Sequence, residues 1–270
     1  MSGTFEFYPS ISLHDPVGER LNSAKEKGIT MVIDKGLGLR KLEDLLETAS
    51  SYLDFIKLGF GTTALYPINV LKEKIQLAQA NEISMYPGGT FFEIAFYQNK
   101  LQEYLTKAWE LGFTKIEISD GTIQLDLDQR KQAIQLARNF GFNVITEYGK
   151  KIAGSTIEIE PLIQTIENDL SAGARFIIVE GRESGENVGI YDGRGNLRSD
   201  FSDIVEQLNP YHQYLIWEAP KKNQQVELMT WFGPNVHLGN IAPDEIFSVE
   251  SLRRGLRSDT FFLFSGRENN

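Results

Sequence analysis

The sequence contains no cysteine and only three histidines. The missing cysteines exclude disulfide bonds, iron–sulfur ligation and thiol catalysis, and three histidines leave little material for a zinc site. No run of about twenty apolar residues occurs, and Met1–Asp15 lacks the basic region and the apolar stretch of a signal peptide. We therefore expect a soluble, cytoplasmic protein that does not contact a membrane.

Basic residues are outnumbered by acidic ones, 27 to 37, so the formal net charge is −10 at pH 7. Nucleic-acid backbones and anionic lipid surfaces repel such a chain, so the composition argues against both as partners. If the ligand is an anion, the charge that binds it has to be concentrated locally. The hydrophobic content of 41% allows a chain of 270 residues to bury a substantial core.

Eight short runs rich in β-branched or aromatic residues each lead into glycine, proline or charged residues. They are Thr30–Gly36, Asp54–Phe60, Ile83–Gly89, Lys115–Gly121, Asn143–Gly149, Arg175–Gly181, Tyr214–Pro220 and Asn235–Ile241. Apolar residues recur with helical spacing between several of them, at Leu71–Ala80, Leu101–Leu111, Gln129–Phe140 and Leu162–Ala172. This alternation, with about thirty residues from strand to strand, is typical of βα units.

Eight such units predict an α/β protein with a single (β/α)8 TIM-barrel domain over residues 1–270, which begins with a short extended segment to about residue 28. An open doubly wound sheet is the alternative fold. It has little support, because Gly36 and Gly38 are not followed by the third glycine of the dinucleotide-binding fingerprint.

Charged residues crowd the predicted carboxyl ends of the strands, where barrels of this kind have their active sites. They are Asp34, Lys35, Lys57, Glu117, Asp120, Glu147, Glu180, Arg182 and Glu218. Side chains alternate along a strand, so a shared face is expected for Val32/Asp34, Phe55/Lys57, Glu117/Ser119, Ile145/Glu147, Ile178/Glu180 and Ile216/Glu218. A ring of carboxylates with interspersed lysines would then line the mouth of the barrel.

Buried charges of this kind need a metal ion, a ligand or each other. Several carboxylates without a neighbouring histidine or cysteine suit Mg²⁺ better than zinc. The alternative is that these groups form salt bridges at the rim and never touch a substrate.

A basic segment follows the last predicted strand and contains Arg253, Arg254 and Arg257. Phosphate sites of barrels are often built from the seventh and eighth loops, so these arginines are candidates for binding a phosphate. The alternative is a basic helix end that favours its own dipole. His237, inside the eighth strand, is expected to be a packed histidine rather than a ligand.

The longest loop is expected at Glu183–Asp200, where four glycines interrupt any regular structure. Two interpretations remain open. The loop is either a lid over the site or a surface hairpin with its turn at Asp192-Gly193.

At these strand ends the sequence resembles the phosphosulfolactate synthase family over nearly the whole chain. The matching strings are Val32-Ile-Asp-Lys-Gly36, Phe55-Ile-Lys-Leu-Gly-Phe-Gly-Thr62, Tyr86-Pro-Gly-Gly-Thr-Phe-Phe-Glu93, Ile116-Glu-Ile-Ser-Asp-Gly121, Thr146-Glu-Tyr-Gly-Lys-Lys151, Val179-Glu-Gly-Arg-Glu-Ser-Gly185, Trp217-Glu-Ala-Pro220 and Leu252-Arg-Arg-Gly-Leu-Arg257. Each string alone is weak, but all of them in order make a specific signal. Two departures concern the phosphate side: Ser258 stands where the family has glycine, and the run Asn235–Asn240 differs from the archaeal type.

The resemblance implies Mg²⁺-dependent addition of sulfite to phosphoenolpyruvate, which gives (2R)-phospho-3-sulfolactate, an early step of coenzyme M biosynthesis in methane-forming archaea. It implies that Lys151 is the general acid, with a pKa lowered by a nearby metal ion and an arginine. The residues expected in the site are Lys151, Glu147 and Lys57 for catalysis, Asp34, Glu117, Glu180 and Glu218 for the metal, and Lys35, Arg182, Ser184, Arg253, Arg254 and Arg257 for the substrates.

The same family also includes heat-stress-associated proteins that have lost parts of these motifs and resemble binding or chaperone-linked proteins. Retention of Lys151, of Glu180-Gly-Arg-Glu-Ser-Gly185 and of Glu218-Ala-Pro220 favours an enzyme here. Homo-oligomeric assembly is a further expectation.

Overall fold

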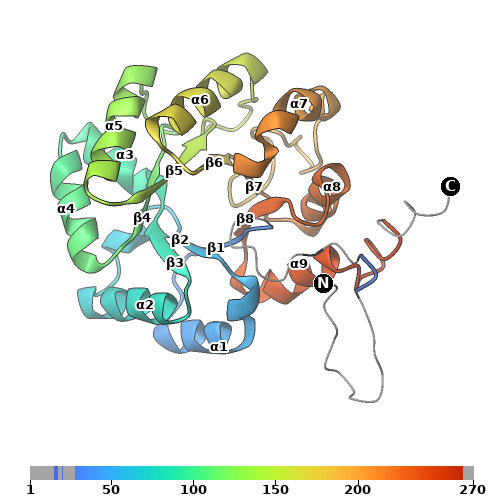
Figure 1. Ribbon diagram of the computed structural model, residues 1–270, viewed down its shortest axis with the longest axis horizontal. Helices are drawn as coiled ribbons and strands as arrows, with labels where there is room; N and C mark the ends of the chain where they lie inside the picture. The colour runs from blue at the N-terminus through green and yellow to red at the C-terminus, as the bar shows by residue number, and fades with distance from the viewer. Residues whose placement is uncertain (1–14, 18–19, 21–27, 264–270) are drawn as a thin grey trace.

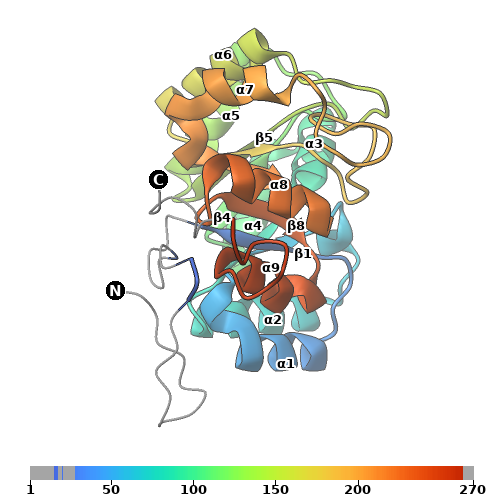
Figure 2. The same cartoon turned by 90° about the vertical axis from the view of Figure 1, so that its right-hand side faces the viewer.

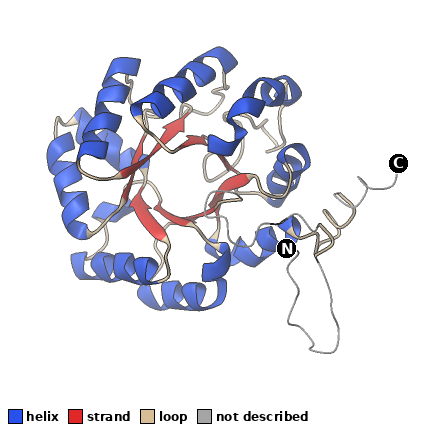
Figure 3. Cartoon of the chain, in the orientation of Figure 1, coloured by secondary structure: helices blue, strands red, loops and turns tan. Residues whose placement is uncertain are grey.

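The computed structural model describes residues 15–17, 20 and 28–263, so most of the predicted N-terminal segment lies outside the described residues. Eight parallel strands form one sheet with the order β3-β2-β1-β8-β7-β6-β5-β4. Their pairing leaves β3 beside β4, which completes a nearly closed ring (Figure 3). The strands are β1 (Thr30–Asp34), β2 (Phe55–Leu58), β3 (Ser84–Pro87), β4 (Lys115–Ile118), β5 (Asn143–Tyr148), β6 (Phe176–Val179), β7 (Leu215–Glu218) and β8 (His237–Ile241).

Helices surround this ring on the outside (Figure 1). They are α1 (Leu39–Ala49), α2 (Ile68–Ala80), α3 (Gly89–Tyr97), α4 (Leu101–Leu111), α5 (Leu127–Asn139), α6 (Ile159–Ala172), α7 (Phe201–Leu208), α8 (Lys222–Phe232) and α9 (Ile246–Arg253). Each predicted strand range contains the strand found there, and each predicted helical segment overlaps a helix, although α2, α5 and α6 begin two or three residues before their predicted ranges. The predicted (β/α)8 barrel is therefore confirmed.

Local sequence signals set several helix ends. Helix α5 begins at a capping box, in which Asp126 accepts a hydrogen bond from the Gln129 N–H and the Gln129 side chain accepts one from the Asp126 N–H. Helix α4 stops at Gly112, whose φ of 97° is open to glycine but costly for most other residues. These caps fix where α5 begins and where α4 ends.

The strands bury two different faces. One large apolar cluster includes Val32, Leu42 and Ile56 and lies between the strands and the helices. A smaller cluster fills the inside of the barrel with Ile29, Met31, Phe55, Tyr86, Ile145, Phe176, Ile178 and Ile216. Residues two positions further along these inward-facing rows reach the carboxyl end of the barrel. Which of the two alternating sets of side chains in a strand faces inward therefore decides which charged residues enter the site.

The long loop after β6 is packed onto the barrel. Val188, Ile190 and Tyr191 are buried, and the Tyr191 hydroxyl donates to the Glu218 carbonyl at 2.7 Å. Tyr191 also forms an isolated antiparallel β-bridge with Leu197. In the turn between them, the Asp192 carboxylate accepts hydrogen bonds from the Arg194 and Asn196 N–H groups. These contacts agree with the hairpin interpretation of Glu183–Asp200. Figure 2 shows this loop on the same side of the barrel as the start of α3.

The amino end of the barrel contains two residues that the sequence had singled out. His237 is buried, accepts the Ile29 N–H on Nδ1 and contacts the Gln213 carbonyl through Nε2. Burial lowers the pKa of His237 to about 4, so it is a neutral packed histidine, as predicted. Arg253 is fully buried and donates to the Pro234, Val236 and Ile29 carbonyls at 2.5, 2.7 and 3.2 Å.

These contacts correct the prediction of a phosphate-binding role for Arg253. The carbonyls that it contacts lie before β8 and β1, which is the end of the barrel opposite to the active-site face. The basic segment was assigned by its place after the last strand, but α9 carries Arg253 back to the amino end. Its guanidinium group links the first and last strands where they meet.

We expect Arg253→Met to lower the free energy of unfolding by on the order of 3 kcal/mol, because three backbone carbonyls lose a charged donor. Arg257→Met is the control. Arg257 is half-buried and contacts Ser248 and Asp259, so its loss should cost less than about 1 kcal/mol. Urea unfolding of both variants measures the difference. Equal destabilisation would show that Arg253 does not have this structural role.

Candidate active site

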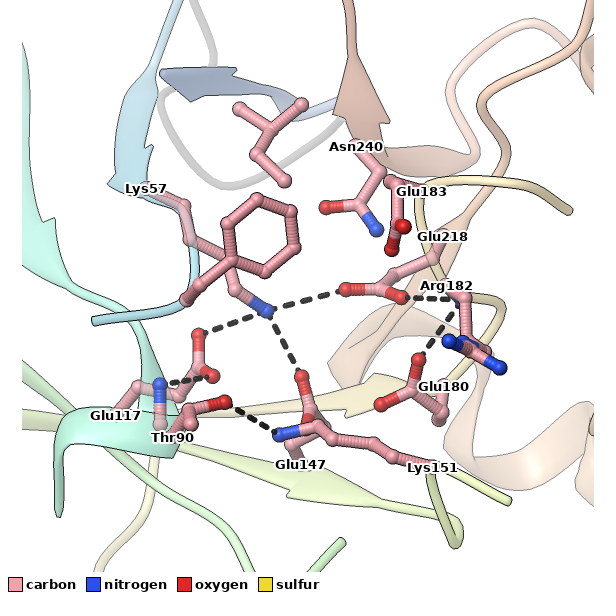
Figure 4. A pocket seen from close by; sticks show the side chains of 13 residues that line it. Lys57, Thr90, Glu117, Glu147, Lys151, Glu180, Arg182, Glu183, Glu218 and Asn240 are labelled. Carbon is pink, nitrogen blue, oxygen red and sulfur yellow. Dashed lines mark hydrogen bonds and ion pairs between the residues drawn. The ribbon is translucent and has the colours of Figure 1, made fainter. Parts of the chain in front are cut away.

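A pocket of about 160 Å³ opens at the carboxyl end of the barrel. Most of the residues that line it come from strand ends, as the fold class predicts. Figure 4 shows them pointing toward a common space. The lining residues are Ile33, Lys57, Phe60, Gly89, Thr90, Glu117, Glu147, Lys151, Glu180, Arg182, Glu183, Glu218 and Asn240.

Lys57 lies at the centre of this pocket. Its ammonium group is 2.8 Å from Glu147, 3.1 Å from Glu218 and 3.2 Å from Glu117. All of these side chains are at least nine-tenths buried. Burial opposes the charge, but the carboxylates outweigh it and hold the pKa of Lys57 well above its usual value. Lys57 is therefore a permanently charged group shared by three strands of the barrel.

Lys151 lies beside this cluster, just after β5. Its Nζ is 2.8 Å from the Glu147 carboxylate and 3.2 Å from the Glu93 carboxylate, and 23% of its side chain is exposed to the pocket. Thr90 is at 3.4 Å. The neighbouring Lys150 instead points to Asp120 and to the Ile123 carbonyl, and does not line the pocket. The structure thus brings Lys57, Glu147 and Lys151 together, as predicted for the catalytic set.

The expected direction of the Lys151 pKa differs from the one found. Burial lowers it, but Glu147, Glu93 and other carboxylates act more strongly, so the pKa is raised above its usual value. The prediction assumed cationic neighbours, whereas the protein surrounds Lys151 mainly with anions. In the protein alone, the ammonium form of Lys151 is therefore strongly favoured.

Glu93 is a buried residue of the site that the strand-end argument missed. It lies in α3, and its carboxylate accepts hydrogen bonds from the Ser119 hydroxyl, from the Gly121 N–H at 3.1 Å and from the Thr122 N–H at 3.0 Å. The same carboxylate holds Lys151. The residue was present in one of the matching strings, but helix α3 had not been predicted, so nothing placed its side chain.

Three carboxylates offer a site for a metal ion. One oxygen each from Glu147, Glu180 and Glu218 lies within 4.8 Å of the other two, and all three residues are buried. The Oε2 atom of Glu180 is buried without a hydrogen-bond partner among the described residues. Burial and the neighbouring Glu147 and Glu218 raise the pKa of Glu180 well above its usual value. A carboxylate in this position needs a proton or a cation, and three carboxylate oxygens fit a hard divalent ion such as Mg²⁺.

Glu117 has a different position from the one expected of a metal ligand. Its Oε1 accepts the Gly89 N–H at the start of α3 at 2.6 Å, and its other oxygen is 3.2 Å from Lys57. The positive end of the α3 helix dipole thus faces one oxygen of this carboxylate, and the Lys57 ammonium group faces the other. Burial still raises the pKa of Glu117, to about 7. Glu117 lines the pocket, but it is not part of the three-carboxylate cluster.

Asp34 lies outside the pocket, which corrects its assignment as a metal ligand. Its carboxylate pairs with Lys74 of α2 at 2.5 Å, and accepts from the Tyr66 hydroxyl and the Gly36 N–H at 2.9 and 2.8 Å. The alternation argument was right that Val32 and Asp34 share a face, but that face points to the helices. Ile33 is the residue of β1 that lines the pocket.

The remaining predicted substrate-binding residues divide into two groups. Arg182 lines the pocket, and its backbone N–H donates to Glu180 and Glu218. Lys35 and Ser184 are exposed and do not line it. Arg254 pairs with Glu250 and Asp15, and Arg257 contacts Ser248, so the structure does not bring either arginine to the pocket. Other lining residues that the prediction lacked are Phe60, Thr90, Glu183 and Asn240.

Within the described residues, no helix is both long and apolar enough to cross a membrane. Among solved structures, the chain is similar in fold to N-acetylneuraminate lyase from Mycoplasma synoviae. The TM-score is 0.55 at 10% identity, over 89% of this chain and 78% of that one. This likeness shows the barrel fold alone.

Comparison of the sequence with known proteins identifies much closer relatives. A phosphosulfolactate synthase of Methanothermobacter thermautotrophicus is 44% identical over 89% of this chain and 94% of its own length. One from Bacillus subtilis is 37% identical over 93% and 98%. The Arabidopsis thaliana protein HEAT-STRESS-ASSOCIATED 32 is more distant, at 22% identity over 83% and 86%.

The model of one protein family matches residues 18–259, nearly the whole described barrel. The strand-end strings that first indicated the resemblance all fall within this range. The chain belongs to the (2R)-phospho-3-sulfolactate synthase (ComA) family.

Proposed function

We propose that this protein is a Mg²⁺-dependent phosphosulfolactate synthase, which adds sulfite to phosphoenolpyruvate. The observation that carries the proposal is the buried arrangement of Lys57, Lys151 and the three carboxylates Glu147, Glu180 and Glu218 in one pocket. Membership of the family and identities of 37 to 44% with phosphosulfolactate synthases support the same activity. A role in making coenzyme M or another sulfonate belongs to the proposal.

The charge of the pocket supports the requirement for a divalent cation. Five carboxylates, those of Glu93, Glu117, Glu147, Glu180 and Glu218, surround the two ammonium groups of Lys57 and Lys151. Both proposed substrates are anions, so the pocket needs further positive charge before they can bind. Glu147, Glu180 and Glu218 would hold the cation. It would supply the charge that stabilises negative charge developing on the substrate carboxylate.

In the proposed reaction, the sulfur lone pair of sulfite forms a bond to C3 of phosphoenolpyruvate. The electrons of the double bond move to C2 and its carboxylate, and a proton then forms the new bond at C2. No bond to the phosphate breaks, and nothing is oxidised or reduced. The protein therefore has to bind two anions side by side, stabilise charge on the carboxylate and deliver one proton.

Lys151 has the position and the charge for the proton transfer. Its Nζ is held between Glu147 and Glu93 while part of its side chain faces the pocket. Lys57 is more deeply buried and bound on three sides, so it holds the carboxylates in place rather than moving a proton. Arg182, which lines the same pocket, offers a planar donor pair to an oxyanion.

The proposed activity is tested by incubating the purified protein with phosphoenolpyruvate, sulfite and Mg²⁺. Mass spectrometry should detect phosphosulfolactate, and omission of sulfite should abolish the product. A protein that is folded and bound to Mg²⁺ but forms no sulfonate would refute the proposal.

Lys151→Ala should lower kcat by roughly 10²- to 10⁴-fold with a smaller change in KM, because a positioned general acid acts mainly in the transition state. Lys150→Ala is the matched control, because it removes the same charge from the adjacent residue, whose side chain is bound to Asp120. Steady-state kinetics of both variants separates the roles. A near-normal kcat for Lys151→Ala, or a larger loss in Lys150→Ala, would show that the acid is misassigned.

Mg²⁺ should raise the melting temperature of chelator-treated protein by several degrees, because an ion at about 100 times its Kd adds about 2.7 kcal/mol of stability. Glu180→Gln should remove most of this shift. Asp34→Asn should lower the melting temperature but keep the shift, since Asp34 pairs with Lys74 outside the pocket.

Calorimetric scans with and without Mg²⁺ measure both effects. Full turnover after exhaustive EDTA treatment, or an unchanged shift in Glu180→Gln, would contradict the proposed metal site.

A further inference from the structure

Asn240 is a polar residue of the pocket to which the mechanism above gives no task. It is the fourth residue of β8, is 4% exposed and lines the pocket. Its amide oxygen is buried without a hydrogen-bond partner among the described residues. Figure 4 shows its amide reaching into the pocket near Glu183 and Glu218, with no dashed line to either. Buried amides are normally bonded, so a group outside the described protein residues is the natural partner.

The backbone of Asn240 carries a second sign of function. Its φ is 54°, a left-handed value that non-glycine residues rarely adopt. Six non-glycine residues of the described chain have such a φ, and three of them, Phe60, Arg182 and Asn240, line this one pocket. Strained backbone gathers at sites where it aims a side chain at a ligand. For Asn240, the unusual φ accompanies a side chain that faces the pocket.

The chemistry of the surroundings indicates what the amide binds. Carboxylates already dominate this side of the pocket, through Glu183 and Glu218. Rotation of the amide exchanges its oxygen and its N–H₂ group, so either can face the cavity. An amide N–H₂ group donates to an oxyanion without adding a charge beside Glu218. The ends of strands seven and eight are also where barrels commonly bind phosphate. Arg253, Arg254 and Arg257, which follow β8, do not line this pocket.

We propose that Asn240 is a substrate-binding residue, whose amide donates a hydrogen bond to an oxyanion oxygen of a substrate. The inference rests on the proposed function for the identity of the anions, which are phosphoenolpyruvate and sulfite. Both carry oxyanions, so the two are tested separately. Asn240 itself transfers no proton and forms no covalent bond.

The test measures binding rather than turnover, by titrating Mg²⁺-saturated protein with phosphoenolpyruvate and, in separate runs, with sulfite. Asn240→Gly removes the amide and keeps the backbone, because glycine adopts a φ of 54° without strain. It should raise the Kd of one of the two anions by about 10-fold or more, the effect of losing one hydrogen bond to a charged group. The anion whose Kd rises is the one that Asn240 binds.

Asn240→Asp separates a donor from an acceptor. A carboxylate cannot donate to an anion and would repel it, so this variant should bind the same anion more weakly than Asn240→Gly does. If the amide oxygen instead served a cation, Asn240→Asp would bind Mg²⁺ at least as tightly as the wild type and would retain the anion. That result would overturn the proposal.

Asn99→Gly is the matched control, because Asn99 has a φ of 56° but is exposed between α3 and α4. It should leave both dissociation constants unchanged. Both glycine variants should melt within a few degrees of the wild type, which excludes misfolding as the cause of weaker binding. Binding of both anions without turnover would contradict the proposed function and leave this subsite standing. Equal dissociation constants for wild type and Asn240→Gly would overturn the subsite.

Discussion

The structure of the site depends on one buried ammonium group. Lys57 reaches from β2 to carboxylates of β4, β5 and β7, so a single side chain ties together strands on different sides of the barrel. Without it, the like charges would have to be protonated or separated, because buried carboxylates repel each other strongly. With it, one cation is shared among several anions, and Glu180 keeps an oxygen without a hydrogen-bond partner in the described part of the chain.

The excess of buried carboxylates over ammonium groups connects the fold to the proposed chemistry. A cluster of apolar side chains that includes Phe55, Ile145, Ile178 and Ile216 lies inside the barrel, and charged residues follow each of these two positions later along the chain. The charged groups are held by contacts from several strands. A bound cation and the anionic substrates would then balance the buried charges of the pocket. The exposed part of Lys151 faces the pocket beside these charged groups, where a proton has to be delivered.

Much of this arrangement could be predicted from the sequence. Each of the eight strands falls within its predicted range, because turn residues and charged ends delimit short apolar runs. The inward rows Phe55/Lys57, Ile145/Glu147 and Ile216/Glu218 followed from simple alternation. The alternation does not say which of the two faces is inward, and this is why Asp34 was assigned to the site although it pairs with Lys74 on the helix side.

Other parts of the site depend on tertiary structure that no local pattern reports. Arg253 follows the last strand, yet α9 returns it to the amino end of the barrel. Glu93 enters the site from a helix, and its role is visible only when Ser119 and Lys151 are placed beside it. Asn240 lies in a strand as expected, but its left-handed φ, and an amide oxygen without a partner among the residues that the structure describes, are properties of the folded structure.

The central claim is that the buried charges of this pocket direct a proton to C2 after sulfite adds at C3. Reaction of the protein with phosphoenolpyruvate and sulfite in heavy water, followed by proton NMR of the product with a chiral shift reagent, tests it most directly. The account predicts a sulfonate with one deuterium at C2 in a single configuration and none at C3. Product with deuterium at C3, or with both configurations at C2, would contradict it.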